Sequence, residues 1–147
     1  MEQDIKVDSV RSQSSGIIGR SRSRAHDATL TLDSSSRPQP DGFTNSEAFL
    51  AGVSSCGVTM IEMHAEENGI PLKGLNVTIK GSRHTDVTHY ESINMHFELI
   101  GVTQTQAEEL VKVYQGRCPL YGTLILSTKI GVDVTAVPAD EKVKSAA

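Results

Sequence analysis

The sequence is poor in aromatic residues and in cysteine. Its 147 residues include no tryptophan, three tyrosines and three phenylalanines, so an aromatic surface on which nucleic-acid bases could stack is not expected. Two cysteines are too few for a disulfide scaffold or for a four-cysteine zinc site. No apolar run approaches the roughly 20 residues that a membrane-spanning helix needs. A transmembrane protein is therefore excluded, and no membrane partner is expected.

The net charge of the chain is small, and its sequence shows no targeting signal. There are 14 basic and 18 acidic side chains, a net charge of −4, which argues against nucleic acid as a partner. The segment Met1–Val10 carries three acids and lacks the apolar stretch of a signal peptide. The five histidines show no metal-ligand spacing, and no glycine-rich phosphate loop is present. We expect a cytoplasmic protein with two reduced thiols, no metal and no cofactor.

The first third of the chain has the pattern of short strands. Residues 4–33 are broken by serine and glycine, which predicts a hairpin-like pair of strands and then a third strand at Arg24–Leu32. Residues 34–42 hold two prolines, a glycine and no apolar side chain, so they are expected to form a loop.

A long helix is predicted at Asn45–Glu67. Thr44 and Glu47 fit a capping box at its start, and Asn68-Gly69 followed by proline fits its end. Apolar residues surround most of its circumference, which indicates burial on most sides. We expect a sheet to cover part of this helix and a partner subunit to cover the rest.

The remaining pattern is two strands, a helix and a last strand. Clean alternation of apolar and polar residues at Leu75–Lys80 and Ile93–Leu99 predicts antiparallel strands with one covered face. Thr103-x-x-Gln106 is a second capping box, and a strand follows at Ile130–Ala136. The order β-β-β-α-β-β-α-β predicts an α+β fold in one domain, residues 1–137, with a mobile polar tail at 138–147.

Cys56 lies inside the first predicted helix, and two interpretations of it are open. A free cysteine in an apolar stripe is commonly a small buried hydrophobe. However, Gly52 and Gly57 flank it, and a glycine inside a helix costs about 0.8–1 kcal/mol relative to alanine. Such a sequence indicates close approach at this turn, by another part of the protein or by a ligand at the sulfur.

Cys118 also has two interpretations. It precedes Pro119, and proline favours the first position of a helix, so Cys118 is a candidate N-cap. The free backbone amides at the start of that helix would stabilise a thiolate of Cys118. Alternatively, it continues the buried stripe of Leu110 and Tyr114.

A reactive thiolate at Cys56 needs a nearby cation, because this residue lies beyond the first turn of its helix. Candidates alternate with serine in the N-terminal strands: Arg20, Arg22 and Arg24. Strand phase places them on the face of Leu30 and Leu32, so Arg24 is expected to point inward; the alternative is that all three are solvated. Glu47 is placed either to brace such an arginine or only to cap the helix.

With these contexts established, the chain resembles the osmotically inducible protein C and organic hydroperoxide resistance family (OsmC/Ohr). The resemblance rests on NSEAFLAGVSSC at 45–56, on IPLKGL at 70–75 and on RCPLYGTL at 117–124. It extends over roughly residues 20–137. Ser46 stands where the family usually has proline, and Glu47 is one residue closer to Cys56 than in the hydroperoxide-resistance branch, which indicates the OsmC-like branch.

The resemblance implies antiparallel sheets wrapped around long central helices in an intertwined homodimer. It also implies a cysteine-based peroxidase for organic hydroperoxides, in which Cys56 is the peroxidatic thiolate and Cys118 the resolving thiol. Arg24 and Glu47 would form the activating pair, and an external dithiol would reset the enzyme. An apolar lining is expected to favour an organic peroxide: Phe49, Val53, Met60 and Tyr121. The alternative function is a non-catalytic dimer that binds a small apolar or thiol-reactive ligand at its interface.

Overall fold

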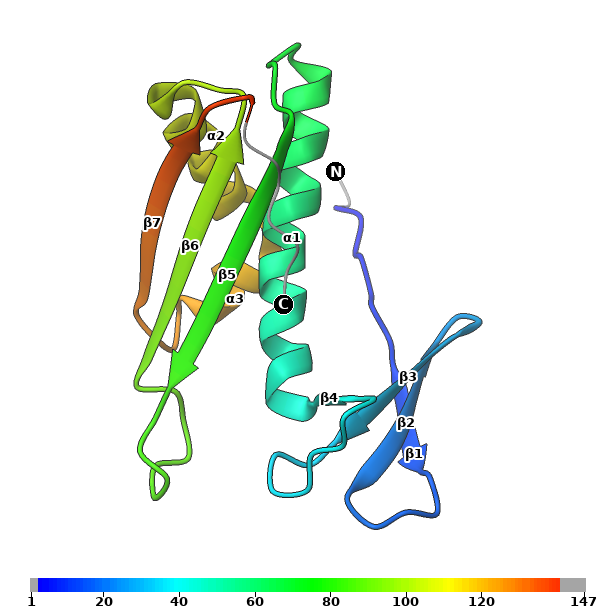
Figure 1. Cartoon of the computed structure of the whole chain (residues 1–147). Coiled ribbons are helices and arrows are strands. Elements are labelled where there is room, and N and C mark those ends of the chain that lie inside the picture. The colour runs from blue at the N-terminus through cyan, green and yellow to red at the C-terminus, as the bar shows by residue number, and fades with distance from the viewer. Residues whose placement is uncertain (1–2, 141–147) are drawn as a thin grey trace. The chain divides into compact units, whose positions relative to one another are not determined.

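The computed structural model describes residues 3–140 and shows an α+β arrangement with two sheets and one long helix (Figure 1). The chain forms two compact units, residues 1–49 and 50–147, which are described separately. The elements are β1 (Arg11–Ser14), β2 (Arg20–Ala25), β3 (Ala28–Asp33), β4 (Phe43–Thr44), α1 (Asn45–Glu67), β5 (Gly74–Ser82), β6 (Ser92–Ile100), α2 (Gln104–Arg117), α3 (Pro119–Leu124) and β7 (Ile130–Val137). The α+β class predicted from the sequence is confirmed.

The N-terminal unit contains a four-stranded sheet in the order β1-β2-β3-β4, coloured blue to cyan in Figure 1. The first three strands are antiparallel neighbours, and β4 joins β3 in parallel. The predicted third strand at Arg24–Leu32 is interrupted by a tight turn, in which His26 has a positive φ of 55°. β2 therefore ends at Ala25 and β3 begins at Ala28.

This turn changes the strand face on which the three arginines lie. Across the β2–β3 pair, Arg24 lies opposite Thr29 and Arg22 opposite Thr31. The arginines therefore share the face of the threonines, not that of Leu30 and Leu32, because directly opposed residues project to the same side. The prediction that Arg24 points to the leucine face is wrong, since the alternation restarts after the chain reverses.

Arg20 is held by two carboxylates of its own unit. Its Nε and Nη2 donate to Asp33 at 2.7 and 3.0 Å, and Nη2 also donates to Asp41 at 2.7 Å. Asp33 is fully buried in this contact, and the hydrogen bonds from Arg20 hold the pKa of its carboxyl below the ordinary value. A Cβ at Gly42 would lie 2.7 Å from Asp33 Oδ2. The guanidinium thus fastens the loop at 34–42 to β2.

Both ends of α1 follow the local signals of the sequence. Thr44 N–H donates to Glu47 Oε1 at 2.9 Å, and Glu47 N–H donates to Thr44 Oγ1 at 3.2 Å, which is the predicted capping box. At the other end Gly69 has a φ of 63°, and Ile70 N–H donates to Ala65 O at 2.9 Å. Left-handed glycine after the last turn is a common helix stop, so the predicted bounds Asn45–Glu67 are confirmed.

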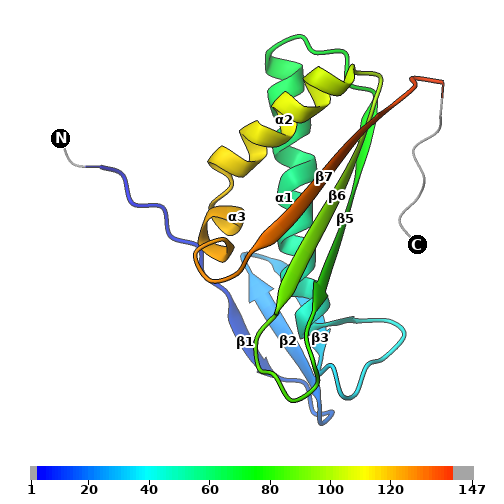
Figure 2. The same ribbon diagram turned by 90° about the vertical axis from the view of Figure 1, so that its left-hand side faces the viewer.

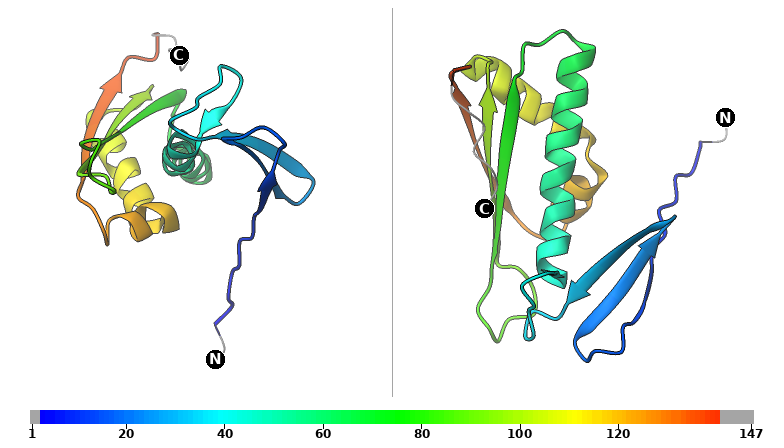
Figure 3. Two further views of the ribbon diagram at one scale, coloured as in Figure 1. Left: turned by 90° about the horizontal axis from the view of Figure 1, so that it is seen from below. Right: turned by 45° about the vertical axis from the view of Figure 1, so that its right-hand side comes forward.

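The C-terminal unit has a three-stranded sheet in the order β5-β6-β7, with α1 and α2 on the same side of it (Figures 2 and 3). β5 and β6 are antiparallel, as predicted, and the covered side chains of β6 are Ile93, Met95, Phe97 and Leu99. β7 pairs with β6 in parallel, which differs from the predicted antiparallel sheets. The reason is that α2 and α3 form a crossover, which returns the chain to the end where β6 began.

Only one stripe of α1 is buried within the chain. It consists of Val53, Gly57, Ile61 and Ala65, at the four-residue spacing of one helix face. On other faces, the side chains of Phe49 and Met63 are 50% and 60% exposed. Burial on most sides is therefore not seen in the single chain, and the partner subunit expected to cover the rest remains a prediction.

A side chain of α2 closes the outer edge of β7. The amide of Gln104 donates from Nε2 to Val134 O at 2.9 Å, and its Oε1 accepts from Ala136 N–H at 2.8 Å. Thr103, with Gln106, forms the second predicted capping box at the start of the same helix. Between residues 3 and 140, no helix is long and apolar enough to cross a membrane. The part of the predicted mobile tail at 141–147 lies outside the described residues.

Candidate active site

The structure brings the two thiols together, although 62 residues separate them along the chain. The Cys118 thiol donates to Cys56 Sγ at a sulfur–sulfur distance of 2.7 Å. Both cysteines are free thiols. Cys118 lies at the junction of α2 and α3, and Cys56 lies in α1, three residues after Val53. Both residues belong to the C-terminal unit.

Other elements approach α1 at the two glycines near Cys56, tightly at Gly57 and at ordinary contact distance at Gly52. A Cβ at Gly57 would lie 3.2 Å from Phe97 Cε1 and 3.7 Å from Tyr114 Cζ. A Cβ at Gly52 would lie 3.7 Å from Leu120 Cδ1. The close approach predicted at this turn is thus made by side chains of β6, α2 and α3, and it lets the helix carry Cys56 against them.

Cys118 satisfies both interpretations made from the sequence. It is 2% exposed and continues the buried stripe of α2. It is also the N-cap of α3, where its Sγ accepts from Tyr121 N–H at 3.4 Å and Pro119 takes the first helical position. Its own backbone N–H donates to Tyr114 O at 2.9 Å. The sulfur is therefore fixed from both helices.

The two sulfurs differ in their access to solvent. Cys56 is half-buried, whereas Cys118 is buried. Burial and the neighbouring Cys118 raise the pKa of the Cys56 thiol to about 12. No basic side chain at 50–140 contributes to this pKa. The C-terminal unit by itself therefore favours the neutral thiol of Cys56.

Tyr114 lies in α2, one turn before Cys118, and no role at the site was predicted for it. It is completely buried, and its hydroxyl donates to Val53 O in α1 at 3.0 Å. Burial, followed by charge at Cys118 and Cys56, raises the pKa of this phenol. The signal available in the sequence was its position four residues before Cys118, which places both side chains on one face of α2.

The sequence that contains these two cysteines matches a known protein family. The model of the OsmC-like protein family matches residues 38–134, more than half of the chain and both cysteines. The chain belongs to the OsmC-like protein family. The family predicted from the three sequence motifs is thus confirmed.

Relatives of this OsmC-like chain include a protein named hydroperoxide reductase from Mycoplasma pneumoniae. It is 30% identical over 115 residues, which cover 74% of this chain and 82% of the relative. An OsmC-like protein structure from the same organism has a TM-score of 0.79 at 26% identity, covering 90% of this chain and 98% of that one. An organic hydroperoxide resistance protein from Elizabethkingia anophelis has a TM-score of 0.72 at 14% identity, covering 92% and 100% of the two chains. The last comparison supports the fold alone.

The other two predicted site residues of this OsmC-like chain belong to the N-terminal unit. Glu47 acts there as the helix cap, and hydrogen bonds from Thr44 lower the pKa of its carboxyl. Arg24 is exposed on β2, as is Arg22, whose Nη2 reaches Ser15 O at 3.5 Å. Arg20 is instead bound by Asp33 and Asp41.

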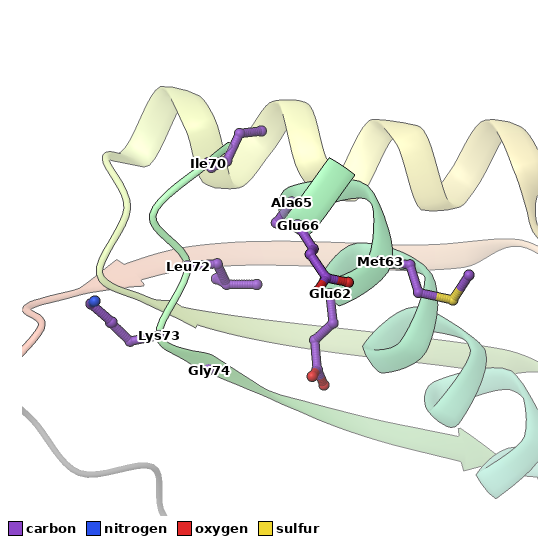
Figure 4. Close-up of a pocket in the computed structure, with 8 residues that line it drawn as sticks. All are labelled: Glu62, Met63, Ala65, Glu66, Ile70, Leu72, Lys73 and Gly74. Carbon is purple, nitrogen blue, oxygen red and sulfur yellow. The ribbon is translucent and has the colours of Figure 1, made fainter. Parts of the chain in front are cut away.

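Two depressions on the surface of the C-terminal unit lie along the second half of α1. The larger, of about 480 Å³, is shown in Figure 4 and does not include either cysteine: Glu62, Met63, Ala65, Glu66, Ile70, Leu72, Lys73 and Gly74. A second, of about 270 Å³, begins one turn after Cys56: Thr59, Met60, Met63, His64, Glu67 and Arg117. In the part of the chain that is described, no cluster of three or more His, Cys, Asp or Glu could hold a metal ion.

Proposed function

We propose that this protein is a thiol-dependent peroxidase that reduces organic hydroperoxides with Cys56 as peroxidatic and Cys118 as resolving cysteine. The observation that carries the proposal is the 2.7 Å contact between the two sulfur atoms. The printed name of the Mycoplasma pneumoniae relative, hydroperoxide reductase, supports the same reaction class.

The roles of the two cysteines follow from their exposure. The thiolate of Cys56, the more accessible sulfur, attacks the O–O bond of the hydroperoxide. The bond breaks, the alcohol leaves with a proton, and Cys56 becomes a sulfenic acid. The buried Cys118 then attacks this sulfur: an S–S bond forms, the S–O bond breaks, and water leaves with the thiol proton. An external dithiol restores both thiols by exchange.

Features of α1 support an apolar substrate and a second copy of the chain at the site. Met60 and Met63 line the depression that begins one turn after Cys56. Methionine adapts to apolar groups of varied shape, which favours an organic hydroperoxide over hydrogen peroxide. The exposed apolar side chains on α1, Phe49 among them, are suited to contact with a second subunit. The protein is accordingly proposed to act as a homodimer.

Intact-mass measurement after one equivalent of an organic hydroperoxide tests this proposal. Reduced protein should lose two hydrogen atoms within one chain, and peptide mapping should find them in a Cys56–Cys118 disulfide. An unchanged mass would favour the alternative, a non-catalytic dimer that holds a small apolar or thiol-reactive ligand. Slow alkylation of both native thiols, with no oxidation, would mean that the cysteines are purely structural.

Replacement of Arg24 by alanine should raise the pKa of Cys56. A cation within a few ångströms lowers the pKa of an acid by roughly one to three units. Without it, burial and the neighbouring Cys118, which both raise the pKa of this thiol, are no longer opposed. At pH 7 the alkylation rate should then fall about ten- to a thousand-fold, because each pKa unit changes the thiolate fraction tenfold. The measurement is pH-dependent alkylation, scored on the Cys56 peptide.

Arg22→Ala is the matched control, since it removes the same charge from the same strand face two residues away. A shift only in Arg24→Ala assigns the cation to Arg24, and a shift only in Arg22→Ala transfers the role. If neither variant moves the Cys56 titration, the proposed arginine activation is refuted.

A further inference from the structure

The Tyr114 hydroxyl connects the two helical turns that carry the cysteines. Tyr114 lies one turn before Cys118 on α2, and the Cys118 N–H donates to its carbonyl at 2.9 Å. Its hydroxyl donates to the carbonyl of Val53, three residues before Cys56 on α1, at 3.0 Å. A single buried side chain thus links the backbone of both cysteine-bearing segments.

Helix stability does not require this hydroxyl, whose other contact is with Met95 Sδ at 3.8 Å. The Tyr114 ring packs between Phe97 and Tyr121, with ring centroids 5.6 and 5.4 Å away, and a phenylalanine ring would make the same contacts. A carbonyl in mid-helix accepts the N–H four residues on and keeps a second lone pair. Tyr114 uses that second lone pair of Val53, so α1 is complete without it. What the bond adds is a fixed spacing between α1 and α2.

The hydroxyl also remains a donor throughout the catalytic cycle. Tyr114 is fully buried, and burial together with negative charge at either cysteine raises the pKa of its phenol. It therefore stays protonated at any pH at which the enzyme would work, whichever sulfur carries charge.

We infer that Tyr114 is a positioning residue for disulfide formation: its bond to Val53 holds Cys118 against Cys56 while Cys56 is a sulfenic acid. The inference rests on the proposed peroxidase function and concerns only its second step. In that step the S–S bond forms as the S–O bond breaks and water leaves. Speed matters here, because a sulfenic acid that waits can react with a second peroxide to give sulfinic acid.

Tyr114→Phe removes the hydroxyl and keeps the ring. Stopped-flow peroxide consumption should give a first step within about two-fold of wild type, since Cys56 itself is untouched. Disulfide formation should slow about three- to ten-fold, the range expected for one neutral hydrogen bond. Dimedone labelling of the sulfenic acid and the fraction of Cys56 sulfinic acid at high peroxide should rise accordingly.

Two controls separate positioning from general loosening. Val111→Ala truncates another buried α2 residue, three positions before Tyr114, and Tyr90→Phe removes a hydroxyl from the β5–β6 connection. Both should close the disulfide at the wild-type rate. If Tyr114→Phe also closes at that rate, or if Val111→Ala slows closure equally, the inference is overturned. Absence of a Cys56–Cys118 disulfide in the peroxide-treated wild type would instead contradict the proposed function itself.

Discussion

Replacing Cys56 with serine should reduce hydroperoxide consumption to the rate measured without protein. A serine hydroxyl is not ionised at neutral pH, so the nucleophile is lost, while Cys118 is 2% exposed and not accessible to peroxide. The measurement is hydroperoxide loss in the presence of an external dithiol. Serine is already tolerated at the two preceding positions of α1, Ser54 and Ser55, so the helix should persist.

Ser55→Ala is the appropriate comparison for this experiment, because it changes the adjacent, exposed position of the same turn. It should consume peroxide at the wild-type rate. Turnover retained by the Cys56→Ser variant would remove Cys56 from the mechanism, and with it the proposed assignment of roles.

Replacing Cys118 with serine should stop the reaction after the first step. Serine is a strong N-cap, so its hydroxyl can accept from Tyr121 N–H and preserve the start of α3. With one equivalent of peroxide and no added thiol reductant, the wild-type protein should end as the Cys56–Cys118 disulfide. The variant should instead gain one oxygen atom at Cys56 and form a dimedone adduct. Intact mass before and after dimedone distinguishes the two products.

The resolving role of Cys118 also predicts how the Cys118→Ser variant behaves during turnover. With an external dithiol present, continuous cycling at the wild-type rate would show that Cys118 is dispensable. Conversion of the trapped Cys56 to sulfinic acid at high peroxide should accompany the loss of cycling. Neither result depends on which peroxide is the natural substrate.

Local signals predicted the helices of this chain well. The Thr44 and Thr103 capping boxes and the glycine stop at Gly69 lie at the predicted helix ends. These interactions span three to five residues, so the sequence contains all the atoms they involve. The cap position of Cys118 before Pro119 was predictable for the same reason.

Features that depend on the path of the chain were not predictable. The turn at His26 contains neither glycine nor asparagine, so the segment Arg24–Leu32 has the sequence pattern of a single strand. For this reason the predicted strand face of Arg24 was wrong. The parallel pairing of β7 depends on the crossover through α2 and α3, which strand patterns do not encode.

At the site, the sequence pointed to two cysteines that are neighbours in the structure, but not to their electrostatics. Two cysteines 62 positions apart proved to be neighbours, yet the raised pKa of Cys56 follows from how deeply α1 packs. The link between Tyr114 and Val53 joins residues 61 positions apart, and no local pattern announces it. Contacts of that separation emerge only from the three-dimensional packing.

The Gln104 amide has a consequence for how sheets of this protein can grow. It occupies main-chain groups of β7 at Val134 and Ala136 that a foreign strand would need for pairing. An edge strand with unpaired main-chain N–H and C=O groups can pair with a strand of another chain and so cause aggregation. Lateral addition of another polypeptide along the far side of β7 is thereby discouraged.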